Sequence, residues 1–130
     1  MRYLLDVNAL IALGLEFHAL HVRVARWFRS EVQSSYFTCP ITELGFVRVI
    51  AQVPAYRTGV QDARKLLLRL KENQSRPIEF VADSKDIASL PAWVTTPALT
   101  TDGYLVQLAK SHGGILATLD RGIPGSFLIP

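Results

Sequence analysis

The sequence predicts an α/β fold: one domain over residues 1–130, with three α/β/α layers and a central parallel sheet of four to five strands. Short apolar segments alternate with helical ones along the chain, and this order requires parallel strands joined by helical crossovers. Segments such as "YLL" and "ILATL" are apolar throughout, as expected where helices cover both faces of a sheet. The 130 residues are 49% hydrophobic and 19% charged, which suits a single folded core.

The chain begins with a predicted strand and two predicted helices. A buried strand at Tyr3–Leu5 leads into a helix at Ala9–Leu15, for which Asn8 is a suitable N-cap. The periodicity of His18–Val32 predicts a second, amphipathic helix. Its predicted apolar face comprises Val22, Ala25, Trp27 and Phe28.

A second strand and two further helices follow. The strand is predicted at Tyr36–Thr38, and a helix continues from Pro40, a residue suited to a first helical turn, to about Gln52. Pro54 ends that helix. An amphipathic helix is predicted at Thr58–Glu72, with apolar Leu66, Leu67 and Leu70.

The last third returns to the sheet. A short helix is predicted at Asp83–Leu90 and a longer one at Thr100–His112, which the following Gly113 and Gly114 cap. The remaining strands are predicted at Ile78–Val81, at Ile115–Leu119 and, on the edge, at Phe127–Ile129.

Composition excludes several classes of protein. The apolar runs are far too short for a membrane span, and Asp6 and Asn8 interrupt the only segment that resembles a signal peptide. Cys39 is the single cysteine, which excludes a disulfide framework and a thiolate metal cluster. A cytoplasmic protein is the simplest interpretation. The net charge of +3 weakly favours an anionic partner.

Two predicted strands lead directly into aspartates, "YLLD" at Asp6 and "ILATLD" at Asp120. Ligands of open parallel sheets bind beyond the carboxyl ends of the strands, so both carboxylates are expected at one edge. Two helical acids join them. Glu43 shares an apolar helix face in "ITELGFVRVI", and Asp102 lies in a first helical turn, where the helix dipole favours a carboxylate.

Four carboxylates in one pocket repel one another and persist only when protons or cations neutralise them. Oxygen ligands favour Mg²⁺, with Mn²⁺ as an alternative, over zinc. Such sites are typical of phosphoryl-transfer enzymes. Asn8 and Thr118 are predicted to orient the carboxylates from behind.

Each acid also has a purely structural interpretation. Asp6 and Asp120 are plausible turn residues, and Asp6 is also a plausible helix cap. Asp102 is equally plausible as part of an N-terminal cap. Glu43 is the hardest to explain this way, because charged residues rarely face a core unpaired. A salt bridge to Arg48 or to another arginine is the structural alternative.

The three stretches "LLDVNALIAL", "ITELGFVRV" and "TTDGYLVQLAKSHGGILATLDRGI" together resemble the PIN-domain proteins, specifically the VapC-type toxins of bacterial toxin–antitoxin pairs. The resemblance implies a PIN-like fold and a metal-dependent endoribonuclease that leaves 5′-phosphate and 3′-hydroxyl ends. It implies an acidic site of Asp6, Glu43, Asp102 and Asp120, supported by Asn8 and Thr118.

The chain departs from that pattern in one place and leaves another unexplained. Many relatives carry a further acid shortly after the last aspartate, where this chain has Arg121, Gly122 and Ile123. A second metal is therefore expected to bind weakly, or only with substrate. Ala55–Ala98 matches no motif.

The implied partners are an RNA substrate, an antitoxin and a second copy of the chain. Setting the four pocket acids aside leaves seven acidic against 14 basic residues, a balance that suits RNA. Predicted phosphate contacts are Arg23, Arg26, Arg29, Arg64, Lys65, Arg69 and Lys71. A groove between the helices around Val22–Phe28 and Leu66–Leu70 is expected to take an amphipathic antitoxin segment. The resemblance also implies that an antitoxin arginine neutralises the acids, and that the protein forms a homodimer.

Three other interpretations compete with a ribonuclease. A PIN-fold module that binds RNA or protein without catalysis is the alternative, although all four acids are present. A haloacid-dehalogenase-like phosphatase requires a second aspartate where Asn8 stands. A receiver domain requires paired acids at the first strand, and both fit poorly.

Overall fold

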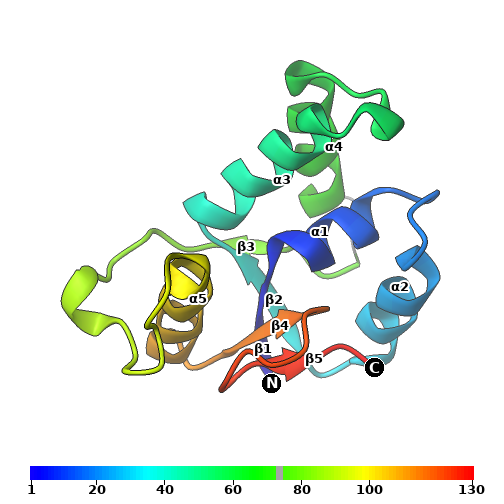
Figure 1. Cartoon of the computed structure of the whole chain (residues 1–130). Helices are drawn as coiled ribbons and strands as arrows, with labels where there is room; N and C mark the ends of the chain where they lie inside the picture. The colour runs from blue at the N-terminus through cyan, green and yellow to red at the C-terminus, as the bar shows by residue number, and fades with distance from the viewer. Residues whose placement is uncertain (73–74) are drawn as a thin grey trace.

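A parallel five-stranded sheet forms the centre of the fold (Figure 1). The structure is a computed structural model that describes residues 1–72 and 75–130. The strands lie in the order β3-β2-β1-β4-β5, and every neighbouring pair is parallel. The sheet thus confirms the predicted parallel topology. The strands are β1 (Arg2–Leu5), β2 (Ser35–Thr38), β3 (Glu79–Phe80), β4 (Ile115–Thr118) and β5 (Phe127–Leu128).

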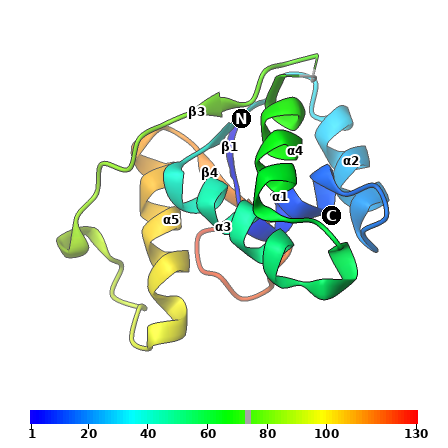
Figure 2. The ribbon, with the colours of Figure 1, turned by 90° about the horizontal axis from the view of Figure 1, so that it is seen from above.

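Helices cover both faces of the sheet, in the three layers that the apolar strands predict. Helix α5 lies on one face, and α1 and α2 lie on the other, with α3 and α4 packed beside α1 (Figures 1 and 2). The helices are α1 (Val7–Gly14), α2 (His21–Ser30), α3 (Pro40–Gln52), α4 (Val60–Glu72) and α5 (Thr100–Ser111).

The alternation of side chains along the strands separates two cores. Leu4 and Phe37 pack with α5, whereas their neighbours Tyr3, Leu5 and Tyr36 pack with the helices on the opposite face. Successive side chains of a strand point to opposite faces, so a strand that is apolar at every position feeds both cores. This explains why β1 and β2 show no polar alternation.

The structure decides between the two caps that the sequence offers for α1. Asp6, not Asn8, is the N-cap, and its Oδ1 accepts a hydrogen bond of 2.8 Å from the backbone N–H of Val7. Asn8 is the second residue of the helix and uses its side chain elsewhere. Aspartate and asparagine are similarly good N-caps, so the choice between them depended on where the strand ends.

Two further predictions were wrong in detail. Val22 was expected on the apolar face of α2, but its side chain is 63% exposed, and Val24 is buried in its place. The segment Asp83–Leu90 forms a single 3₁₀ turn at Ile87–Ser89 and no longer helix. Within the described residues, no helix combines the length and apolar character needed to cross a membrane.

Candidate active site

Three neighbouring strands end at one edge of the sheet and bring the predicted site residues there. Strand β1 lies between β2 and β4, with Leu4 opposite Phe37 and Leu5 opposite Ala117. Asp6 therefore follows β1 beside the end of β4, and Asp120 comes two residues after that end. This is the carboxyl edge, where open parallel sheets bind their ligands.

A hydrogen-bond network fixes the carboxylate of Asp6. The Thr118 hydroxyl donates to Asp6 Oδ2 at 2.7 Å. The same hydroxyl oxygen accepts hydrogen bonds from Asn8 Nδ2 at 3.2 Å and from the backbone N–H of Asp120 at 3.1 Å. Asp6 is only 6% exposed. Asn8 and Thr118 thus support the carboxylate of Asp6 and also hold the backbone that carries Asp120.

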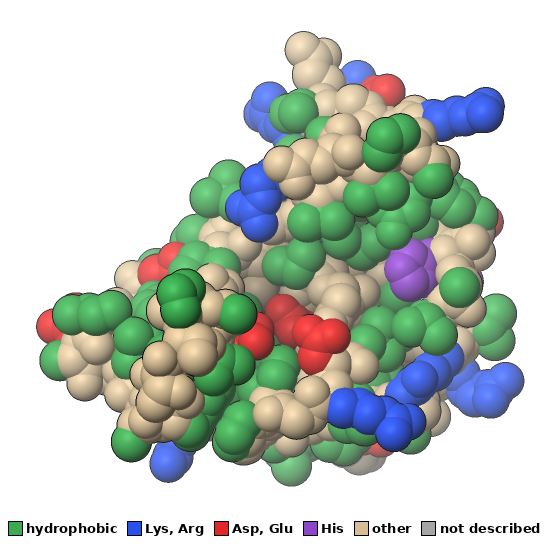
Figure 3. Space-filling model, in the orientation of Figure 1, with side chains coloured by type: hydrophobic (Ala, Val, Ile, Leu, Met, Phe, Trp, Pro, Cys, Tyr) green, Lys and Arg blue, Asp and Glu red, His purple; other side chains and the backbone are tan. Residues whose placement is uncertain are grey.

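Three aspartates share this side of the edge. Burial raises the pKa of Asp6, and the nearby charges of Asp102 and Asp120 raise it further, against the lowering effect of its hydrogen bonds. Burial and the charge of Asp120 raise the pKa of Asp102. Among the described residues, no lysine or arginine forms an ion pair with any of the three. Figure 3 shows acidic side chains gathered in a hollow of the molecular surface.

Glu43 has a different environment. It lies on α3 with its side chain 24% exposed, and its Oε2 accepts hydrogen bonds from Thr38 Oγ1 at 2.5 Å and from Lys71 Nζ at 2.6 Å. Glu43 is not among the charges that raise the pKa of Asp6. The structural alternative, a salt bridge to Arg48 or another arginine, was right in kind but wrong in partner, because Glu43 pairs with a lysine of α4. The structure thus groups the aspartates and holds Glu43 at the β2 side of the same edge.

Sequence reasoning missed Thr38 and assigned Lys71 to phosphate contact, not to Glu43. Thr38 had a signal: "SYFT" and "ILAT" are apolar strands that both end in threonine, and they flank β1. Each threonine donates to a carboxylate. Lys71 had no local signal, because 28 residues and a change of helix separate it from Glu43.

The aspartate cluster suits a hard divalent cation by the chemistry of its donors. All of them are carboxylate oxygens, and their mutual repulsion lacks an internal counter-charge in the described part of the chain. As they stand, no three His, Cys, Asp or Glu side chains of the described residues form a cage that could hold a metal ion. Mg²⁺ commonly binds through one or two carboxylates and water, so a closed cage is not required.

Two of the predicted phosphate contacts are engaged inside the protein. Arg23 donates through Nη2 to the carbonyl oxygen of Ile129 at 2.5 Å, which ties α2 to the end of the chain. Lys71 is held by Glu43. The other predicted contacts are exposed: Arg26, Arg29, Arg64, Lys65 and Arg69.

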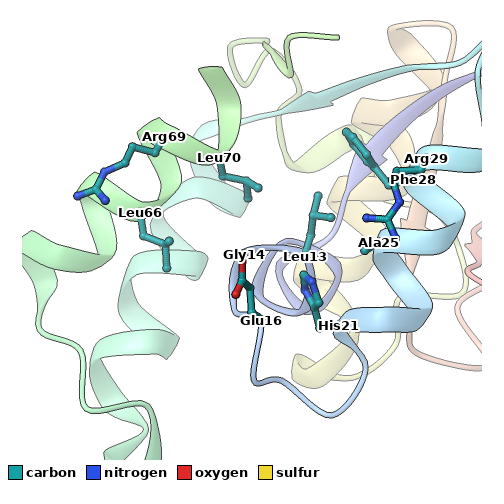
Figure 4. A pocket seen from close by; sticks show the side chains of 10 residues that line it. All are labelled: Leu13, Gly14, Glu16, His21, Ala25, Phe28, Arg29, Leu66, Arg69 and Leu70. Atoms are coloured by element: carbon teal, nitrogen blue, oxygen red, sulfur yellow. The ribbon is translucent and has the colours of Figure 1, made fainter. Parts of the chain in front are cut away.

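The predicted groove between α2 and α4 is present, with α1 as its floor. It encloses about 390 Å³. Figure 4 shows Leu66 and Leu70 of α4 across the cavity from Ala25 and Phe28 of α2, with Leu13 of α1 between them. Arginines stand on both walls, Arg29 on α2 and Arg69 on α4. An apolar floor with basic walls suits an amphipathic segment that carries acidic side chains.

The parallel sheet, its acidic carboxyl edge and the order of the motifs define a PIN domain. The family model described as "PIN domain" matches residues 3–124. The chain belongs to the PIN-domain family. The predicted family and fold are thus confirmed.

Its relatives within that family are VapC ribonucleases. The chain is 37% identical to ribonuclease VapC38 of Mycobacterium tuberculosis over 92% of its length and 86% of the relative's. It is 36% identical to ribonuclease VapC44 of the same organism, over 95% of its length and 89% of the relative's.

Two solved structures share the fold at low sequence identity. The M. tuberculosis toxin VapC20, described as cleaving the sarcin-ricin loop, matches with a TM-score of 0.64 at 11% identity, over 92% of this chain and 89% of that one. VapBC2 of Rickettsia felis, bound to promoter DNA, matches with a TM-score of 0.60 at 14% identity, over 98% and 97% of the chains.

Proposed function

We propose that the protein is a metal-dependent endoribonuclease and the toxin of a toxin–antitoxin pair. The observation that carries the proposal is the cluster of Asp6, Asp102 and Asp120, which share one edge of the sheet without a basic partner among the described residues. Asp6 is buried and Asp102 is half-buried, and holding their like charges beside the exposed Asp120 is unfavourable unless a cation joins them. The relatives named ribonucleases and the VapBC2 structure of Rickettsia felis support RNA as substrate and an antitoxin as partner.

Each side chain has a distinct part in this proposal. Asp6, Asp102 and Asp120 hold Mg²⁺, or Mn²⁺ in its place. When bound, the cation stabilises negative charge on the scissile phosphate and lowers the pKa of a water molecule. Thr118 and Asn8 keep Asp6 in place through the hydrogen bonds described above. Glu43 orients the attacking water from the β2 side, and the cleavage leaves 5′-phosphate and 3′-hydroxyl ends.

The test is cleavage of total bacterial RNA, with the ends mapped by sequencing. Wild type and Asp6→Asn are each incubated with Mg²⁺, with Mn²⁺ and with EDTA. Discrete cuts that require both a metal and Asp6 are expected. RNA that stays intact under every condition, while still binding to the protein, would favour the PIN-fold binding module over the enzyme.

The antitoxin is proposed to dock in the groove of Figure 4. An amphipathic segment would bury its apolar face on Leu66 and Leu70 and pair its acids with Arg29 and Arg69. An arginine of that segment would neutralise the aspartates and exclude the metal. A toxin with this substrate and partner acts in the cytoplasm.

The groove is tested with the product of the adjacent small open reading frame. Leu66→Glu places a charge in the groove and is expected to abolish copurification of the two proteins, while RNA cleavage persists. The matched control is Leu68→Glu, since Leu68 is 55% exposed on the same helix and does not line the groove. Equal binding by both variants would overturn the proposed site.

The homodimer stays a prediction. Light scattering of the purified protein at several concentrations measures its molar mass. A mass of twice 14.4 kDa is expected, and a mass of one chain throughout would contradict the dimer.

A further inference from the structure

The ion pair between Lys71 and Glu43 lies at the proposed site, not on the outer surface. The two side chains are only 18% and 24% exposed, and their charged atoms are 2.6 Å apart. The ammonium group also stands 5.4 Å from the centre of the Phe80 ring, at a distance typical of a cation–π contact. Exposed ion pairs contribute little to stability. This pair is largely shielded from solvent and lies beside the Phe80 ring, so its geometry is defined.

Thr38 connects this pair to the aspartates. It is the last residue of β2, which pairs with β1, and β1 leads directly into Asp6. Neighbouring strands lie about 4.8 Å apart, so the hydroxyl that binds Glu43 belongs to the strand end next to that of Asp6. The pair thus borders the aspartate cluster at the same edge.

Both donors bind the same oxygen of Glu43. Thr38 Oγ1 and Lys71 Nζ each donate to Oε2, whereas Oε1 accepts no hydrogen bond from the described residues. A carboxylate anchored through one oxygen has a fixed orientation and leaves the other oxygen available. This is the arrangement that a residue orienting a water molecule requires.

We propose that Lys71 is a positioning residue of the ribonuclease: together with Thr38 it holds Glu43 through Oε2 and leaves Oε1 to act at the reaction site. The inference rests on the proposed function. It differs from the sequence-based expectation that Lys71 contacts RNA phosphates, because its ammonium group is already engaged by Glu43. The lysine acts through Glu43 and does not touch the substrate.

Steady-state cleavage of a mapped RNA substrate separates these roles. Lys71→Met is expected to lower kcat up to about tenfold, the loss expected for Glu43→Gln itself, with KM unchanged. Lys71→Arg keeps the positive charge and is expected to restore most of kcat. Lys110→Met is the matched control, since it removes the same charge from an exposed position in the last turn of α5 and is expected to leave kcat unchanged.

A second variant removes the other anchor. Thr38→Val deletes the hydroxyl that donates to Oε2 and is expected to lower kcat, again with KM unchanged. In a Glu43→Gln background, Lys71→Met is expected to cause no further loss, because both changes break the same contact. Thermal melts verify that every variant is folded.

The contact between Lys71 and Glu43 is measured in the absence of metal and RNA. In nuclear magnetic resonance spectra of the metal-free wild type, the Lys71 ammonium protons are expected to be protected from exchange with water. Glu43→Gln is expected to remove that protection, whereas Asp62→Asn, a change of an exposed acid of α4, is expected to leave it.

Several results would overturn the positioning role. A rise in KM with steeper salt dependence in Lys71→Met would make Lys71 a phosphate contact. An equal loss of kcat in the Glu43→Gln background would show that it does not act through Glu43. If wild type cuts RNA and Lys71→Met cuts equally well, only this inference fails. If wild type cuts no RNA, the proposed function fails, and the positioning role fails with it.

Discussion

On both sides of the acidic edge a threonine at a strand end donates to a carboxylate, but the charge of that carboxylate is balanced differently on each side. On the β4 side, Thr118 donates to Asp6, and the neighbouring aspartates have no basic partner among the described residues. On the β2 side, Thr38 donates to Glu43, which Lys71 neutralises. Similar strand ends thus hold one carboxylate without a basic partner in the described part of the chain and another beside the ammonium group of Lys71. The fourth acid is therefore not equivalent to the other three.

The largest expected difference between the two sides is in catalysis. Asp120→Asn removes a proposed metal ligand and is expected to lower the cleavage rate about 100-fold or more, equivalent to about 2.7 kcal/mol. Glu43→Gln, on the side where Lys71 balances the charge, is expected to lower the cleavage rate only about tenfold. Rates of RNA cleavage at saturating Mg²⁺ measure both.

The control for this comparison is Asp62→Asn, which changes an exposed acid of α4 and is expected to have no effect. Equal losses from Asp120→Asn and Glu43→Gln would contradict the distinction between the two sides.

The threonines allow a matched comparison of stability. Thr118→Val removes the hydrogen bonds that the hydroxyl makes with Asp6 Oδ2, with Asn8 Nδ2 and with the backbone N–H of Asp120, so a loss of about 2 kcal/mol in the free energy of unfolding is expected. Thr38→Val removes a donor from Glu43, which retains its lysine, and a loss of about 1 kcal/mol is expected. Urea unfolding measures both, and a larger loss from Thr38→Val would reverse the comparison.

The smallest expected effect is the pH-dependent stability of Asp6→Asn without metal. Burial raises the pKa of Asp6 in the folded state above its unfolded value of about 3.9. At pH values between the unfolded-state and folded-state pKa of Asp6, the folded state binds more protons than the unfolded state. Wild type therefore loses stability as the pH rises through this window. Asp6→Asn lacks this penalty and is expected to be more stable at pH 7 by about 1 kcal/mol, or a few degrees in Tm.

Thermal melts from pH 3 to pH 8 check this expectation. The advantage of Asp6→Asn should shrink as the pH falls through the folded-state pKa of Asp6 and disappear below the unfolded value. Added Mg²⁺ should stabilise wild type and not the variant, because only wild type binds it tightly. An advantage that is constant with pH would show that charge burial at Asp6 is not its source.

Local patterns predicted the parts of the fold that depend on near neighbours in the chain. The apolar strands β1 and β4 and the aspartates that follow them are contiguous in sequence, so their place at one edge was predictable. The N-cap of α1 and the buried face of α2 were predicted less well. A shift of one or two residues changes which side chain caps a helix or faces the core, and packing decides that shift.

The sequence by itself determined the layered parallel fold, the acidic edge and the kind of ligand that such an edge attracts. The reason is that strand ends, helix periods and residue chemistry are local properties. Only the tertiary structure decided that Lys71 of α4 neutralises Glu43 and that, among residues 1–72 and 75–130, the aspartates have no such partner. Ion pairs across 28 residues depend on how two helices pack against each other, and no local pattern encodes that distance.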